Sequence, residues 1–169
     1  MSEQNVFDKR KFRGVLGRFA TGVAVVTAEV GGVKLSVTVS SFNSVSLEPP
    51  LVLFSIARSA LGFDLWQQAE HFAVTVLAAH QQELSNRFGK AGGDKWLGID
   101  VARGLYGAPL IPDGLAYFEC RVYARYDGGD HQIVVGEVLH FYEAEAAQAA
   151  GPLVFYGGRY RHLLAMTES

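Results

Sequence analysis

The sequence is poor in cysteine and has no long apolar run, and each absence excludes a class of protein. Cys120 is the only cysteine among 169 residues, so neither an intrachain disulfide nor a cysteine metal cluster can form. No apolar run approaches the roughly 18 residues that a membrane-spanning helix needs. The first residues, MSEQNVFDKRKFR, are too polar and mixed in charge for a signal peptide. We therefore expect a cytoplasmic protein.

Motifs of several common enzyme classes are also missing. The chain has no GxGxxG after a first strand and no phosphate loop, which disfavours a Rossmann fold. It has no GxSxG nucleophile elbow, which disfavours a hydrolase. Its histidines show no metal-ligand spacing, so no metal site is predicted. They are His71, His80, His131, His140 and His162.

Composition indicates one folded domain, residues 1–169, without a surface for nucleic acid or membranes. Apolar residues make up 49% and charged residues 19%, which argues against disorder. The net charge of −2 provides no basic footprint for nucleic acid and no polybasic membrane anchor. A small barrel cannot easily bury this much apolar surface, so we expect a homodimer. The alternative is a hydrophobic monomer.

Strand patterns separated by turn glycines dominate the chain. Residues 23–30 and 33–39 flank Gly31-Gly32, which predicts a β-hairpin. The apolar run after Pro49-Pro50 predicts a buried strand, because the prolines exclude a helix there. Further strands are predicted at residues 72–77, 116–126, 132–142, 153–156 and 160–164.

Helical patterns are few. Phe12, Val15, Leu16 and Phe19 mark one apolar face of a helix near the N-terminus. We predict two more helices, at residues 59–68 with Ser59 as its cap and at residues 79–88 before Gly89. The segment from residue 89 to 112 has little periodicity and is predicted to be a long loop or lid. Many strands and few helices favour a β-barrel with peripheral helices.

The segment TVSSFNSVSLEPPLVLFSIARSA, residues 38–60, is the richest in candidate ligand contacts. Five hydroxyl side chains occur within nine residues, interleaved with apolar side chains. Such a segment can face a flat molecule with polar edges, and we call residues 38–41 the cradle. An ordinary Ser/Thr-rich strand and turn is the alternative.

Four motifs in order resemble the short-chain flavin reductases. They are GRFATGVAVVTA (residues 17–28), the segment at residues 38–60 that begins with the cradle, GDH (residues 129–131) and LVFYGGRYRHL (residues 153–163). The resemblance runs from about Phe12 to Leu164. It implies a mainly β, Greek-key split barrel, usually a homodimer, that transfers hydride from NADH or NADPH to FMN or FAD. It also implies an oxygenase component that receives the reduced flavin by diffusion.

A flavin needs hydrogen-bond donors near N1, O2 and N5, where negative charge develops on reduction. The resemblance assigns these donors to the main chain and hydroxyls of the cradle. The predicted cradle contacts are Thr38, Val39, Ser40 and Ser41. Where the family commonly has Asn-Val-Leu, this chain has Thr75-Val76-Leu77. Thr75 can hydrogen bond there but cannot offer an amide donor and acceptor together.

Arginines are the candidates for flavin phosphate. Arg58 and Ser59 lie where a strand leads into a predicted helix, whose N-terminus would attract an anion. Arg87, at the end of the helix at residues 79–88, is a second candidate. The residues predicted to line the approach to the ribityl chain are Ser55, Ile56 and Ala57. The alternatives are a simple helix cap at Ser59 and solvated arginines.

His131 of the GDH motif is the candidate catalytic residue. The resemblance places it beside the nicotinamide, where it can orient the carboxamide or manage a proton. A turn histidine bonded to a nearby carbonyl is the alternative.

The terminal motif carries four further candidate contacts for the pyridine nucleotide: Tyr156, Gly158, Arg159 and Tyr160. A plain hairpin or bulge is the alternative.

The sequence therefore predicts an NAD(P)H:flavin oxidoreductase in which positioning contributes most of the catalysis. Two other functions remain open on the same barrel. One is a non-catalytic flavin- or haem-binding module, and the other is an FMN oxidase similar to pyridoxamine-phosphate oxidase. The oxidase should carry several basic residues near the flavin for its phosphorylated substrate, and the GDH motif favours the reductase.

Overall fold

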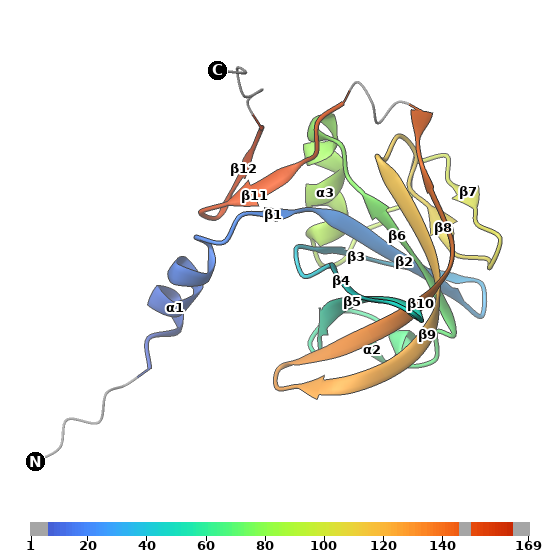
Figure 1. Cartoon of the computed structure of the whole chain (residues 1–169), viewed down its shortest axis with the longest axis horizontal. Helices are drawn as coiled ribbons and strands as arrows, with labels where there is room; N and C mark the ends of the chain where they lie inside the picture. Colours follow the sequence, from blue (N-terminus) through green and yellow to red (C-terminus); the bar gives the residue numbers. More distant parts are fainter. Residues whose placement is uncertain (1–6, 146–149, 164–169) are drawn as a thin grey trace, which may run out of the picture.

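A computed structural model describes residues 7–145 and 150–163. The helices are α1 (Lys9–Leu16), α2 (Phe63–Trp66), the 3-10 helix η1 (Ala79–Gln81) and α3 (Gln82–Gly89). The strands are β1 (Thr21–Gly22), β2 (Ala24–Val30), β3 (Val33–Val39), β4 (Asn43–Leu47), β5 (Pro50–Ala57), β6 (His71–Val76), β7 (Ala102–Arg103), β8 (Pro109–Leu110), β9 (Ala116–Gly128), β10 (His131–Glu143), β11 (Val154–Tyr156) and β12 (Arg159–Arg161). Strands thus dominate the chain, as predicted (Figure 1).

Seven strands form one antiparallel sheet in the order β3-β2-β6-β9-β10-β5-β4. The sheet curls until β3 approaches β5, but these two strands share no ladder. The fold is therefore a split β-barrel with few helices, which confirms the fold class expected from the sequence. Its hairpin turn at Gly31-Gly32 is also confirmed, because both glycines have positive φ, 57° and 81°.

Both faces of β2 are covered, which gives the protein two adjoining cores. One face of the curled sheet encloses Val26, Phe54, Phe72 and other apolar side chains inside the barrel. The opposite face presents Val25, which packs with Leu77, Phe88 of α3, Ile111 and Leu153. This two-sided burial is the reason that β2 is apolar without alternation.

Cys120 lies in the barrel core, as its apolar strand face predicted. Its side chain is fully buried, and burial raises the pKa of the thiol to about 12. The thiol is therefore neutral at physiological pH, and the residue serves packing.

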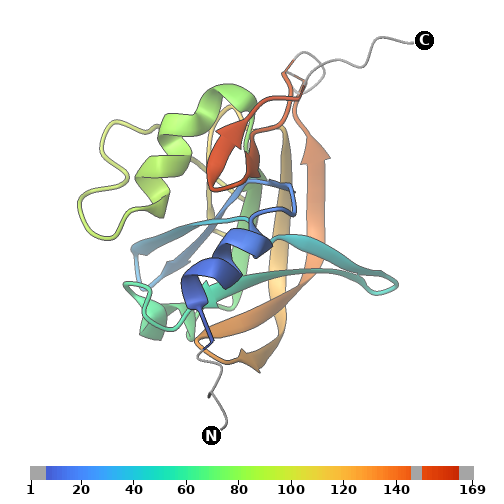
Figure 2. The same ribbon diagram turned by 90° about the vertical axis from the view of Figure 1, so that its left-hand side faces the viewer.

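One strand is missing from the expected secondary structure. Residues 43–47, where no strand was predicted, form the edge strand β4, which pairs with β5. The β4–β5 hairpin extends past the barrel (Figure 2). The segment at residues 89–112 is a long loop, as predicted. It packs against the second core through Trp96, Ile99 and Val101, and its two short strands β7 and β8 pair with each other.

A small outer layer consists of α1 and the three-stranded sheet β1-β11-β12, which we call the arm. The arm stands to one side of the barrel (Figure 1). Gly157 N–H donates to the Gly17 carbonyl at 2.7 Å and thereby joins the β11–β12 turn to the residue that follows α1. The apolar side chains of the predicted N-terminal helix, Phe12, Val15, Leu16 and Phe19, are all exposed. No helix of the described residues is long and apolar enough to cross a membrane.

Substituting Gly136 tests the packing of the barrel core. A Cβ at this position would lie inside van der Waals contact with the Phe72 ring and 3.0 Å from Cys120 Cβ. Because overpacking costs about 1–3 kcal/mol, Gly136→Ala should lower the Tm by roughly 3–10 °C. Gly22→Ala, whose Cβ would meet no atom within 4 Å, is the matched control. Equal melting temperatures for the two variants would contradict this account.

Candidate functional site

A depression of about 290 Å³ lies at the seam where β3 approaches β5. Three segments of the sequence meet in it: the cradle, the end of β5 and the first residue of β10. The lining residues are Val37, Thr38, Val39, Ser40, Ser41, Ser55, Ala57 and His131. The structure therefore brings together most of the residues that the sequence analysis assigned to the flavin ring and the nicotinamide.

The cradle backbone supplies hydrogen-bond donors. β3 pairs only with β2, and alternate N–H groups of an antiparallel edge strand point away from its ladder. Beyond the end of β3, no described residue accepts a hydrogen bond from the N–H of Ser40 or Ser41. A row of free donors on a hydroxyl-rich edge fits the acceptor edge of a flavin ring. The donor chemistry of the depression thus suits the expected cofactor.

Two cradle hydroxyls hold the cradle in place. Thr38 Oγ1 donates to the Ser85 carbonyl of α3 at 2.8 Å. Ser41 Oγ accepts the N–H of Ser55 at 2.9 Å and lies 3.4 Å from the Ser55 carbonyl oxygen. The Ser40 hydroxyl has no partner within the described part of the chain and remains available to a ligand.

Two predicted contacts are contradicted by burial. Ile56 is 1% exposed and packs inside the barrel, because it alternates with Ser55 and Ala57 along β5. Thr75 is fully buried, and a Cβ on Gly114 would overlap its Cγ2 methyl. Its Oγ1 has no partner among the described residues. Neither side chain can reach a flavin in the depression.

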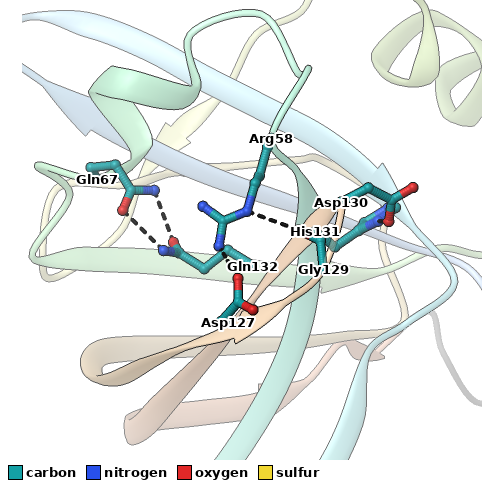
Figure 3. Close-up of polar contacts among 7 residues, drawn as sticks. All are labelled: Arg58, Gln67, Asp127, Gly129, Asp130, His131 and Gln132. Carbon is teal, nitrogen blue, oxygen red and sulfur yellow. Dashed lines mark hydrogen bonds and ion pairs between the residues drawn. The ribbon is translucent and has the colours of Figure 1, made fainter.

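The helix N-terminus predicted at Ser59 is absent, and the phosphate contact at Arg58 and Ser59 stays a prediction. Helix α2 starts later, after Gly62, and has no side-chain cap, so Ser59 lies in a turn. Arg58 Nε donates to the Gly129 carbonyl at 3.0 Å, and its Nη2 pairs with Asp127 Oδ1 at 2.5 Å (Figure 3). Arg58 thus binds the β9–β10 turn through Nε and Nη2.

The β9–β10 turn presents His131 to the depression. His131 Nδ1 lies 2.6 Å from Asp130 Oδ1, and 46% of the His131 side chain is exposed. The hydrogen bond and positive charge of His131, with a smaller contribution from Lys9, lower the pKa of Asp130. Asp130 therefore remains ionised to lower pH than an ordinary aspartate, and it can hold Nδ1 of the ring as a donor.

Further hydrogen bonds attach the β9–β10 turn to β5 and to the residue that follows α2. The Arg58 N–H donates to the Asp130 carbonyl at 3.0 Å. The side-chain amides of Gln67 and Gln132 exchange two hydrogen bonds of 2.8 and 3.1 Å (Figure 3). The backbone around His131 is thus fixed from two sides.

Arg87 and Tyr160 lie outside the depression, against α3. Arg87 donates from Nη2 to the Leu97 carbonyl at 2.6 Å and so ties α3 to the following loop. Tyr160 Oη lies 2.9 Å from Ser85 Oγ and donates to Asn86 Oδ1 at 3.1 Å. Tyr160 therefore attaches the β11–β12 hairpin to α3 through its hydroxyl.

Tyr156, Gly158 and Arg159 line a second hollow, between α1 and the β11–β12 hairpin. The structure thus separates the terminal motif from the cradle, whereas the sequence analysis assigned both to one pair of cofactors.

Sequence reasoning missed the side chains that position His131: Asp130, Asp127, Gln67 and Gln132. Asp130 stands within the GDH motif, so its adjacency to His131 was a usable signal. Asp127 and the two glutamines gave no signal, because their contacts join residues far apart in sequence.

Comparisons with known proteins agree with this fold and site. The family model described as flavin reductase like domain matches residues 16–164. The FMN reductase (NADH) SmoA of Agrobacterium fabrum is 44% identical over 165 residues, covering 95% of this chain and 92% of SmoA. The flavin-dependent monooxygenase reductase subunit HsaB of Mycobacterium tuberculosis is 40% identical over 153 residues, covering 90% and 81% respectively.

Two solved structures show the same fold. Component B of nitrilotriacetate monooxygenase from Mycobacterium thermoresistibile has a TM-score of 0.89 and 36% identity, covering 96% of this chain and 91% of its own. The NADH:FAD oxidoreductase SgcE6 of Streptomyces globisporus, solved with NAD and FAD fragments, has a TM-score of 0.89 and 34% identity, covering 99% and 100%. The expected NAD(P)H-dependent flavin reductase, with its flavin and nicotinamide cofactors, is confirmed as the class of enzyme. The chain belongs to the flavin reductase-like family.

Proposed function

We propose that this chain transfers hydride from NADH or NADPH to FMN or FAD held in the depression between β3 and β5. The proposal rests on one observation: the free cradle donors and His131 line a single depression. No arginine or lysine in the described part of the chain lines it, which disfavours an oxidase that must bind a phosphorylated substrate there. The nicotinamide-dependent reductases among the relatives disfavour a non-catalytic binding module.

The cradle contributes hydrogen-bond donors whose positions are fixed before the flavin binds. The N–H groups of Ser40 and Ser41 would meet the pyrimidine edge of the flavin, where negative charge accumulates during reduction. A bound flavin supplies the hydride-accepting atom, N5. Because Thr38 and Ser41 already hold the cradle backbone against α3 and β5, these donors need little reorganisation when the charge develops.

His131 would orient the nicotinamide. With Nδ1 bonded to Asp130, its Nε2 has no partner among the residues that the structure describes, and it can hydrogen-bond the carboxamide. Asp130 fixes the ring, and the hydrogen bonds of Arg58 and Gln132 fix the turn that carries it. Arg58 is therefore a positioning residue in this proposal, in place of the phosphate contact expected from the sequence.

The reduced flavin would leave the open seam and reach an oxygenase component by diffusion. Relatives named as reductase components of monooxygenases support this role. A single domain is sufficient for this role. The cytoplasmic location remains a prediction from the sequence. We further propose a homodimer, because α1 and the residues just after it carry large exposed apolar side chains, with Leu16 57% and Phe19 79% exposed.

Oxidation of reduced nicotinamide is the direct test of the proposed function. NADH or NADPH oxidation, followed by its absorbance, should require added flavin and saturate with it. Separate titrations with FMN, FAD and riboflavin would rank the flavins. If fluorescence quenching showed flavin binding but no nicotinamide were oxidised, the binding-module or oxidase function would replace the reductase.

Replacing His131 tests its role. His131→Ala should lower kcat or raise the KM for nicotinamide, with an overall loss in kcat/KM of about 10- to 100-fold. Flavin affinity and Tm should be unchanged, because the ring is exposed at the depression. His80→Ala, an exposed histidine outside the depression, is the control. Unchanged turnover and nicotinamide KM would exclude this role for His131.

The homodimer can be tested by charged substitutions at the exposed apolar residues of α1 and of the segment just after it. Sedimentation should give a mass near twice the 18.4 kDa of one chain. The double variant Leu16→Glu/Phe19→Glu should sediment as a monomer, since two buried charges would oppose association. Leu97→Glu, at an exposed apolar residue of another segment, should remain dimeric. A monomeric native chain would refute the proposal.

A further inference from the structure

An open groove of about 740 Å³ runs between α1 and the β11–β12 hairpin, and arginines surround it. Arg10, Arg13 and Arg18 come from α1 and the residues after it, and Arg159 and Arg161 come from β12. We call it the arginine groove. It gathers residues from both ends of the chain, which the Gly157–Gly17 hydrogen bond holds together.

The charge of this groove is unbalanced. It holds five of the ten arginines of a chain whose net charge is −2. Within residues 7–145 and 150–163, no acidic residue lines the groove and none of its arginines forms an ion pair. By contrast, Arg58, Arg103 and Arg121 all pair with carboxylates. Five like charges converging without a counter-charge create a strongly positive local potential that favours an anionic ligand.

Glycines form part of the groove wall. A Cβ built on Gly14, Gly157 or Gly158 would meet no atom within 4 Å, so these positions border open space. Gly157 and Gly158 have φ of 61° and 76°, in the region that favours glycine. A ligand can therefore approach the hairpin backbone closely here, with guanidinium groups on either side.

Hydrogen bonds link the hairpin of the groove to the depression. Tyr160, on the groove's hairpin, is bonded to Ser85 of α3, and the Ser85 carbonyl accepts the Thr38 hydroxyl of the cradle. The β11–β12 hairpin of the groove is thus linked to the cradle by two hydrogen bonds.

We propose that the arginine groove binds the diphosphate of a nucleoside diphosphate, the ADP moiety that FAD and NAD(P)H share. Arginine forks match phosphate oxygens bidentately, which suits a diphosphate better than isolated carboxylates. The groove volume lies in the range of small-molecule sites, and its glycine wall favours a compact ligand over a protein surface. The assignment rests on the proposed function for its source of ADP, but binding itself can be measured without turnover.

Calorimetric titration of the full chain with ADP tests the groove directly. The native protein should bind ADP, and inorganic pyrophosphate should compete with it. Arg13→Gln/Arg161→Gln, which removes one arginine from each side, should weaken ADP binding about tenfold or more, since a hydrogen bond to a charged group contributes about 1.5–3 kcal/mol. Lys11→Gln removes the same charge from α1 outside the groove lining and should change affinity less than about twofold.

Steady-state kinetics of the same variants identify the source of the ADP moiety. A rise in KM for FAD, with riboflavin unaffected, assigns the groove to the flavin. A rise in KM for NAD(P)H with every flavin assigns it to the nicotinamide nucleotide. Either result supports the proposal.

Absence of ADP binding in the native protein, or equal losses in the double variant and Lys11→Gln, would overturn the groove assignment, and an acidic protein partner would then fit its charge better. If the native protein bound ADP but oxidised no nicotinamide, the proposed function would fail while the groove remained supported. An active reductase without ADP binding would refute the groove alone.

Discussion

The unpaired edge of β3 is the constraint on which the active site depends. The sheet curls far enough to enclose a core containing Phe54 and Phe72, yet β3 and β5 share no ladder. An edge strand carries free N–H groups, which are a hazard for aggregation unless something covers them. In this protein the edge continues into the free donors of Ser40 and Ser41. The incomplete closure of the barrel thus provides a binding surface with no specialised loop.

The second requirement is a fixed position for His131, which stands on a turn rather than inside the barrel. The exposed Arg58–Asp127 pair by itself would stabilise little, because water screens it. Its value lies in geometry, since Arg58 also bonds the Gly129 carbonyl, and the Gln67–Gln132 pair adds a second attachment. An arginine that the sequence suggested for phosphate thereby holds the turn that carries His131 against β5.

Helix α3 connects the cradle to the arm, which in the proposed function meet different regions of the cofactors. Phe88 packs into the second core, while Ser85 contacts both Thr38 of the cradle and Tyr160 of the arm. The arm and the cradle are therefore linked through Ser85 by two hydrogen bonds. This arrangement explains why the terminal motif can lie outside the depression and still belong to the same site in the proposed function.

The sequence by itself determined the barrel class, the hairpin at Gly31-Gly32, the cradle and the candidate His131, because strand periodicity, turn glycines and local motifs are encoded by neighbouring residues. Only the tertiary structure decided which side chains face the ligand. Thr75 and Ile56 fit the pattern but are buried, because the two layers of packing cover both faces of the curled sheet. The partners of Arg58 and the convergence of five arginines were equally hidden, since those contacts join segments far apart along the chain.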